Sequence, residues 1–137
     1  TYYYRIDLID SDILISKPSG YINYHKVLET NVLFDKVVNR VIGQKNKYYQ
    51  MIDYSDVMSS TMNVKRNIIN NIERTDFMVF YGLSSYMKLV VYFQKQFYPN
   101  FNRVMIADSY EDALKMILEH KYGKSYFIPR AEYNEDE

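Results

Sequence analysis

The chain of 137 residues contains no cysteine, which excludes disulfides, cysteine-ligated zinc and thiol nucleophiles. Its longest apolar stretches, residues 77–83 and 89–93, are far shorter than the ~20 residues that cross a bilayer, so we expect no membrane insertion. The 17 basic and 17 acidic residues give a formal net charge of zero, which argues against a nucleic-acid binder. The four glycines are isolated, so the chain has no glycine-rich phosphate loop.

What the chain has is a globular composition with an excess of tyrosine. It is 47% hydrophobic and 25% charged, and is therefore too apolar for an intrinsically disordered protein. The 16 tyrosines suit half-buried positions, where the ring packs in the core and the hydroxyl remains exposed to solvent. Tyrosines are also favoured on surfaces that bind a partner. We expect a single α/β domain over residues 1–123. Residues 124–137 read as a linker and acidic tail leading toward a downstream module.

The N-terminal residues predict a hairpin. Residues 2–9 are rich in tyrosine and isoleucine and alternate weakly, as a strand does. After a short turn, residues 13–15 begin a second strand, which the Pro18-Ser19-Gly20 sequence is expected to break, although residues 21–22 could prolong the strand beyond a bulge. Antiparallel pairing of the two strands is the simplest arrangement.

A helical period then replaces the alternation. Apolar residues recur every three or four positions between Asn23, a favourable N-cap, and Gly43, a favourable C-terminal residue. The short apolar run 48–53 predicts a buried strand. Thr61 can cap a second helix, which runs to about Arg74.

The second half of the chain repeats this alternation of strand and helix. Residues 77–81 form the strongest strand, and a helix marked by apolar residues follows a serine cap at Ser84 or Ser85 and stops at Pro99. Residues 103–107 predict another strand. Residues 109–112 resemble a capping box that starts a last helix, which Gly123 ends. The order is ββαβαβαβα, so we expect an α/β fold with a mixed sheet in which right-handed crossovers join parallel strands and the hairpin supplies the antiparallel edge.

Ligands of open α/β sheets bind beyond the carboxyl ends of the parallel strands. In this chain the loops at residues 53–61, 81–85 and 107–109 are expected to meet there. We therefore predict a crevice that could hold a small molecule. Its predicted lining residues are Asp53, Tyr54, Tyr81, Gly82, Leu83, Ser84 and Asp108.

The same loops leave two kinds of ion chemistry open. A phosphate on Ser59, Ser60 or Thr61 would lie near a helix N-terminus, where free amides and the helix dipole favour negative charge. The alternative is that these hydroxyls only cap the helix. Asp53 and Asp108 could together bind magnesium, but a phosphoacceptor site of that kind also needs a lysine after the last strand, which this chain lacks.

The sequence offers no catalytic constellation. His25 and His120 have no serine, aspartate or metal-ligand companion at motif spacing, and His120 suits the C-terminal dipole of the last helix. Because no nucleophile–base pair is evident either, we expect no enzyme, no catalytic residue, no metal site and no cofactor.

Three segments resemble the STAS family of sulfate transporter and anti-sigma-factor antagonist domains. Residues 51–57 are similar to the family's strand that ends in an aspartate, a hydrophobic residue and a serine. Residues 19–23 resemble the turn before its first helix. Residues 80–84, with the amphipathic helix that follows, look like the STAS-like domains at the N-terminus of bacterial sensor proteins, ahead of PAS, histidine kinase or cyclase modules. The resemblance covers roughly residues 2–120, mostly as pattern.

The resemblance implies a non-catalytic, cytoplasmic regulatory domain that acts through a protein partner or a downstream signalling module, with a homodimer as one form of contact. A regulatory serine of the antagonists falls on Met62 when the segments are aligned without gaps, and a short slip brings Ser59, Ser60 or Thr61 there. A small-molecule sensor that uses the crevice and a phosphoregulated anti-sigma-factor antagonist remain alternatives.

Overall fold

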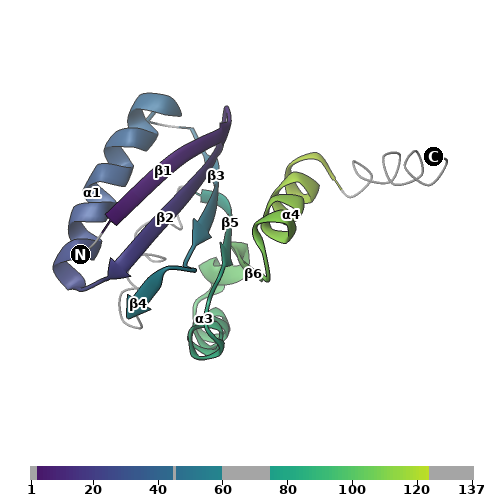
Figure 1. Ribbon diagram of the computed structural model, residues 1–137. Coiled ribbons are helices and arrows are strands. Elements are labelled where there is room, and N and C mark those ends of the chain that lie inside the picture. The colour runs from purple at the N-terminus through teal and green to yellow at the C-terminus, as the bar shows by residue number, and fades with distance from the viewer. Residues whose placement is uncertain (1–2, 45, 60–74, 124–137) are drawn as a thin grey trace, which may run out of the picture.

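The computed structural model describes residues 3–44, 46–59 and 75–123. Within these ranges six strands form a mixed sheet in the order β1-β2-β3-β5-β6, and β4 pairs with β2 off this path (Figure 1). The strands are β1 (Tyr3–Asp10), β2 (Ile13–Tyr21), β3 (Tyr48–Asp53), β4 (Val57–Ser59), β5 (Thr75–Tyr81) and β6 (Val104–Ala107). The described helices are α1 (Tyr24–Val41), α3 (Ser85–Phe97), α4 (Tyr110–Tyr122) and the short 3₁₀ helix η1 (Pro99–Arg103).

The strand directions confirm the expected mixed sheet. β1 and β2 pair antiparallel, and the pairs β2–β3, β3–β5 and β5–β6 are parallel. The predicted break at Pro18 is wrong, because β2 continues to Tyr21. Pro18 lies between Ser16, the last β2 residue paired with β3, and Gly20, the first paired with β4. Its missing amide therefore interrupts neither ladder.

Helices cover both faces of the sheet. Tyr48 and Ile52 are four residues apart on β3 and so point to the same face. Tyr48 packs in a cluster with Phe34 of α1, and Ile52 packs in a cluster with Met87 of α3. Met51 points to the other face and packs in the cluster of α4. Thus α1 and α3 lie on one face and α4 lies on the other (Figure 1).

Side-chain caps begin each of the three described α-helices, as predicted. Asn23 Oδ1 accepts from the Lys26 amide at 3.0 Å, and the hydroxyls of Ser84 and Ser109 accept from amides three residues ahead. The predicted helix over residues 61–74, the phosphorylation candidates Ser60 and Thr61, and the tail 124–137 lie outside the described residues.

The helix α3 turns few of its apolar residues inward. Met87 and Val91 are its buried residues. The aromatic and aliphatic residues that mark the helix in the sequence are largely exposed: Tyr86, Leu89, Phe93 and Phe97. No helix in the described part of the chain is long and apolar enough to cross a membrane.

Candidate functional site

The carboxyl ends of the parallel strands meet at one edge of the sheet, as the sequence predicts. Asp53, the last residue of β3, is in register with Tyr81 at the end of β5, and Tyr81 is in register with Ala107 at the end of β6. The residues that follow, Gly82 and Asp108, therefore lie at the same edge. We call this edge the strand-end rim.

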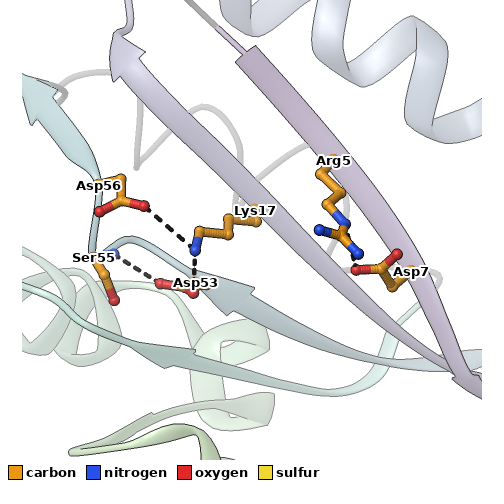
Figure 2. Close-up of polar contacts among 6 residues, drawn as sticks. All are labelled: Arg5, Asp7, Lys17, Asp53, Ser55 and Asp56. Atoms are coloured by element: carbon orange, nitrogen blue, oxygen red, sulfur yellow. Dashed lines mark hydrogen bonds and ion pairs between the residues drawn. The ribbon is translucent and has the colours of Figure 1, made fainter.

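A shared lysine organises the rim at β2 and β3. The Lys17 Nζ lies 3.7 Å from the Asp53 carboxylate and 3.3 Å from that of Asp56 (Figure 2). The Asp53 side chain is only 10% exposed, and its Oδ1 also accepts a hydrogen bond from the Ser55 amide at 2.8 Å. The hydrogen bond with Asp56, followed by the charge of Asp53, raises the pKa of Lys17, so the lysine stays cationic at neutral pH.

Backbone hydrogen bonds hold the loop of residues 54–57 from both sides. The Gly20 amide of β2 donates to the Asp56 carbonyl at 2.9 Å, and the Tyr54 amide donates to the Tyr81 carbonyl of β5 at 2.9 Å. The Val57 amide donates to the Tyr54 carbonyl at 3.2 Å and closes the turn. The loop is therefore fixed between two strands, because its amides and carbonyls have specific partners.

Gly82 permits the close approach of this loop to the end of β5. Its φ of +78° lies in a backbone region that residues with a Cβ rarely adopt. A Cβ at this position would lie 2.7 Å from the Ser55 nitrogen and 2.9 Å from the Ser55 Cα. These are backbone atoms, so they cannot move aside as the end of a side chain can.

Tyr81 is a buried residue, and its phenol lies beside the Asp53 carboxylate. Burial raises the pKa of Tyr81 well above its usual range, and the negative charge and hydrogen bonding of Asp53 raise it further. Its ring packs edge to face against the ring of Tyr110, the first residue of α4, with the ring centroids 6.1 Å apart. Tyr81 therefore remains protonated and links the rim to α4.

The structure gives the other predicted crevice residues different surroundings. Tyr54 and Leu83 are buried in the cluster shared with α3, where the Tyr54 ring packs edge to face on Phe80 at 5.5 Å. Ser84 caps α3. Asp108 is exposed, lies 3.5 Å from the Lys88 Nζ and lines a groove beside α4.

The carboxylates proposed for magnesium already face cations. Asp53 faces Lys17 and Asp108 faces Lys88. In the described part of the chain, no three side chains of the types that bind metals are grouped closely enough to hold an ion. The geometry does not support the magnesium alternative.

Sequence reasoning missed β4 and the exposed residues of the corner it forms with β2. Gly20 and Tyr21 pair with Val57 and Ser59, and the register shifts between them. At this corner the Met58 residue is 77% exposed and Tyr21 is 63% exposed. The role of Lys17 was also missed, since it depends on contacts between β2 and residues at the end of β3, which are far apart in the sequence. We call this corner, with Lys17 and Asp56, the β2–β4 corner.

The whole architecture resembles solved structures at low sequence identity. A DUF3478-family protein with a SpoIIAA-like fold from Shewanella loihica PV-4 superposes with a TM-score of 0.61 at 12% identity over 84% of this chain and 92% of that one. The anti-sigma factor antagonist SpoIIAA in its unphosphorylated form superposes with a TM-score of 0.60 at 10% identity, over 84% of this chain and 97% of that one. The Bacillus cell fate determinant SpoIIAA in its phosphorylated form superposes with a TM-score of 0.53 at 12% identity, over 84% of this chain and 99% of that one.

No family model and no curated protein matches the sequence. The structural likeness extends over nearly the full length of each solved chain, and the strand order and directions agree with the expected mixed sheet. The chain therefore has the SpoIIAA-like, STAS-like fold.

Proposed function

We propose that this chain is a non-catalytic regulatory domain that binds a protein partner through the β2–β4 corner. The observation that carries the proposal is a pair of exposed side chains, Tyr21 and Met58, on backbone that is fixed by hydrogen bonds. Tyrosine and methionine are enriched in protein interfaces, and a preorganised loop loses little entropy on binding. The mixed charges of Lys17 and Asp56 beside them would set the orientation of the partner.

Phosphorylation at the same corner is the regulation that we propose. Ser59 ends β4, directly after Met58, and Ser60 and Thr61 follow it in the sequence. A phosphate there would add negative charge beside the exposed contact residues and would change the affinity for the partner. One of the similar solved structures is described as a phosphorylated form, which motivates this proposal. The bacterial sensor setting, ahead of PAS, histidine kinase or cyclase modules, the cytoplasmic location, the homodimer and the small-molecule ligand remain predictions.

The binding surface can be tested by site-specific photocrosslinking in cells that express the natural protein. A benzoylphenylalanine replaces Met58 in one variant, and in the control it replaces Ser11, which lies in the β1–β2 turn at the opposite end of β2. We expect one discrete adduct from the Met58 position and none from the Ser11 position. An equal adduct from both positions, or none from Met58, would contradict the proposal.

The regulation is tested separately. The chain is incubated with ATP and the protein kinase encoded beside its gene, and peptides over residues 57–64 are analysed by mass spectrometry. We expect one phosphate, on Ser59, Ser60 or Thr61. An unmodified segment would exclude this regulation without affecting the binding proposal.

A further inference from the structure

The strand β1 is an edge of the sheet with little protection against pairing. It lies at the end of the strand order and, among the described strands, pairs only with β2 (Figure 1). Edge strands usually avoid pairing with another chain by being short, by bulging or by carrying lysine or proline. β1 has eight residues, contains neither lysine nor proline, and keeps a regular register with β2 from Tyr3 to Leu8. The other edge strand, β6, has only four residues, and the Lys95 Nζ of α3 lies 3.8 Å from the Met105 Sδ on it.

The two faces of β1 differ in chemistry. Tyr4 and Ile6 pack against the cluster of α1 and so point to the α1 face of the sheet. Leu8 points to the same face by alternation and is 48% exposed. Arg5 and Asp7 point to the other face, where their side chains form an exposed ion pair at 2.9 Å (Figure 2). The strand therefore offers a row of apolar side chains on one face and one charge of each sign on the other.

The sequence from Tyr4 to Leu8 is its own complement in an antiparallel pair. When Ile6 lies opposite the partner subunit's Ile6, Arg5 lies opposite the partner subunit's Asp7. Tyr4 then lies opposite the partner subunit's Leu8. Every directly opposite pair in this register is either apolar or of opposite charge, and pairs of both kinds stabilise antiparallel sheets.

The neighbouring registers do not have this property. Directly opposite residues of an antiparallel pair point to the same face, so a two-fold axis has to pass through a residue and not between two residues. An axis at Arg5 would set two arginines opposite each other, and an axis at Asp7 would set two aspartates opposite each other. Like charges in this position destabilise the pairing. Charge therefore selects the axis at Ile6.

The surrounding charges leave this pairing favourable. The Arg5–Asp7 ion pair lies within one strand and is exposed, so water screens it. Lys17, which lies opposite Arg5 on β2, already faces Asp53 and Asp56. About the axis, each of the four charges would have an opposite charge beside it on its own strand and another across the interface, with like charges only on the diagonals. A second copy fits this edge better than an unrelated strand, because the symmetry supplies the complement twice.

We propose that two copies of this chain pair antiparallel through β1 about a two-fold axis at Ile6, so that the sheet continues from one copy into the other. The axis is perpendicular to the sheet, which keeps the two α1 helices on the same face. Five residues of each strand are paired, so the interface is small, and we expect a Kd of about 1–100 μM. The interface uses β1, whereas the β2–β4 corner uses β2 and β4, so the two proposals stand independently.

Two charge reversals test the interface by complementation. In sedimentation equilibrium of the intact chain, Arg5→Asp and Asp7→Arg should each weaken the dimer at least about tenfold, because each sets like charges opposite each other. An equimolar mixture of the two variants pairs every aspartate with an arginine across the interface, and should regain the affinity of the unaltered chain to within about threefold. Lys115→Glu, at an exposed position of α4, is the control and should leave the Kd nearly unchanged. Circular dichroism would establish that the variants are folded.

A cysteine at the axis tests the register. The chain has no cysteine, so Ile6→Cys introduces a single thiol. Directly opposite residues have Cα atoms about 4.5–5.5 Å apart, which a disulfide can span. We expect Ile6→Cys to form a disulfide-linked dimer under mild oxidation. Leu8→Cys is the control and should form little, because the two copies of this residue would be separated by about 13 Å along the strands.

Three outcomes would overturn the proposal. These are a monomer up to about 1 mM, a mixture of Arg5→Asp and Asp7→Arg that associates as weakly as each variant alone, and equal crosslinking from Ile6→Cys and Leu8→Cys. A dimer that neither charge reversal weakens would equally overturn it, and would assign the association to another surface. Ile6 packs in the core, so the charge complementation decides the question if Ile6→Cys does not fold.

Discussion

Replacing Gly82 with alanine should strongly destabilise the chain, because this position combines an unfavourable conformation with a backbone clash. The φ of +78° costs an alanine about 1–2 kcal/mol relative to glycine. The new Cβ would lie 2.7 Å from the Ser55 nitrogen, so the loop has to move away from β5. That movement would break or stretch the Tyr54–Tyr81 backbone hydrogen bond, at a cost of about 1 kcal/mol. We expect a total loss of about 2–3 kcal/mol.

Gly43→Ala provides the control for the conformational part of this cost. Gly43 also has a positive φ, +101°, but the nearest atom to a Cβ added there would be the side-chain Nδ2 of Asn46 at 3.2 Å, which can move. We expect this variant to lose only about 1–2 kcal/mol. Urea unfolding followed by circular dichroism measures both variants. Equal destabilisation by the two substitutions would refute the close packing of the loop on β5.

Three further substitutions test other parts of the structure. The raised pKa of Tyr81 means that the folded chain keeps a proton that an unfolded tyrosine releases near pH 10, so Tyr81 stabilises the fold below that pH and this stabilisation is lost above it. In urea unfolding, the free energy of unfolding should therefore fall less between about pH 9 and 11 in Tyr81→Phe than in the unaltered chain. Asn31 is buried, and its side-chain amide has no hydrogen-bond partner in the described part of the chain. Asn31→Leu should therefore raise the free energy of unfolding by about 1 kcal/mol. A lower free energy of unfolding in this variant would mean that the amide has a partner. The Lys121 side chain is only 16% exposed and forms an ion pair between α4 and Asp12 of the β1–β2 turn. Lys121→Met should therefore lower the midpoint of thermal unfolding by several degrees. As a control, Lys115→Met, at an exposed position of the same helix, should leave the midpoint nearly unchanged.

Local patterns in the sequence predicted the elements that depend on short-range chemistry. The apolar run 48–53 became β3 with the expected bounds, and Pro99 ended α3 within two residues. The caps at Asn23, Ser84 and Ser109 form because a side-chain oxygen needs only the amide three residues ahead. Each of these features is decided by residues close together in the chain.

Features that depend on distant residues could not be predicted in this way. Whether Pro18 breaks a strand depends on which neighbour needs its amide, and neither β3 nor β4 does. β4 has three residues and pairs with a strand far earlier in the chain, so no periodicity marks it. In α3 the apolar residues occupy more than one face, and periodicity alone could not show that Met87 and Val91 face the sheet.

The same distinction applies to the candidate site. Asp53, Tyr81 and Gly82 could be placed together from the rule that parallel strands end at one edge. The sequence did not show that Tyr54 and Leu83 would be buried beneath that edge, because burial depends on the packing of α3. It also did not show that Lys17 joins Asp53 to Asp56 across two strands.

The central claim is that residues 54–57 and β2 form one fixed surface, and native-state hydrogen exchange tests it most directly. We predict that the amides of Gly20, Tyr54 and Val57 are protected relative to an unstructured peptide, since each donates to a backbone carbonyl. Lys17→Met should speed exchange at Gly20 and Val57 a few-fold and leave Val79 in the centre of β5 unchanged. Exchange of these loop amides at the rate of an unstructured peptide in the unaltered chain would contradict the claim.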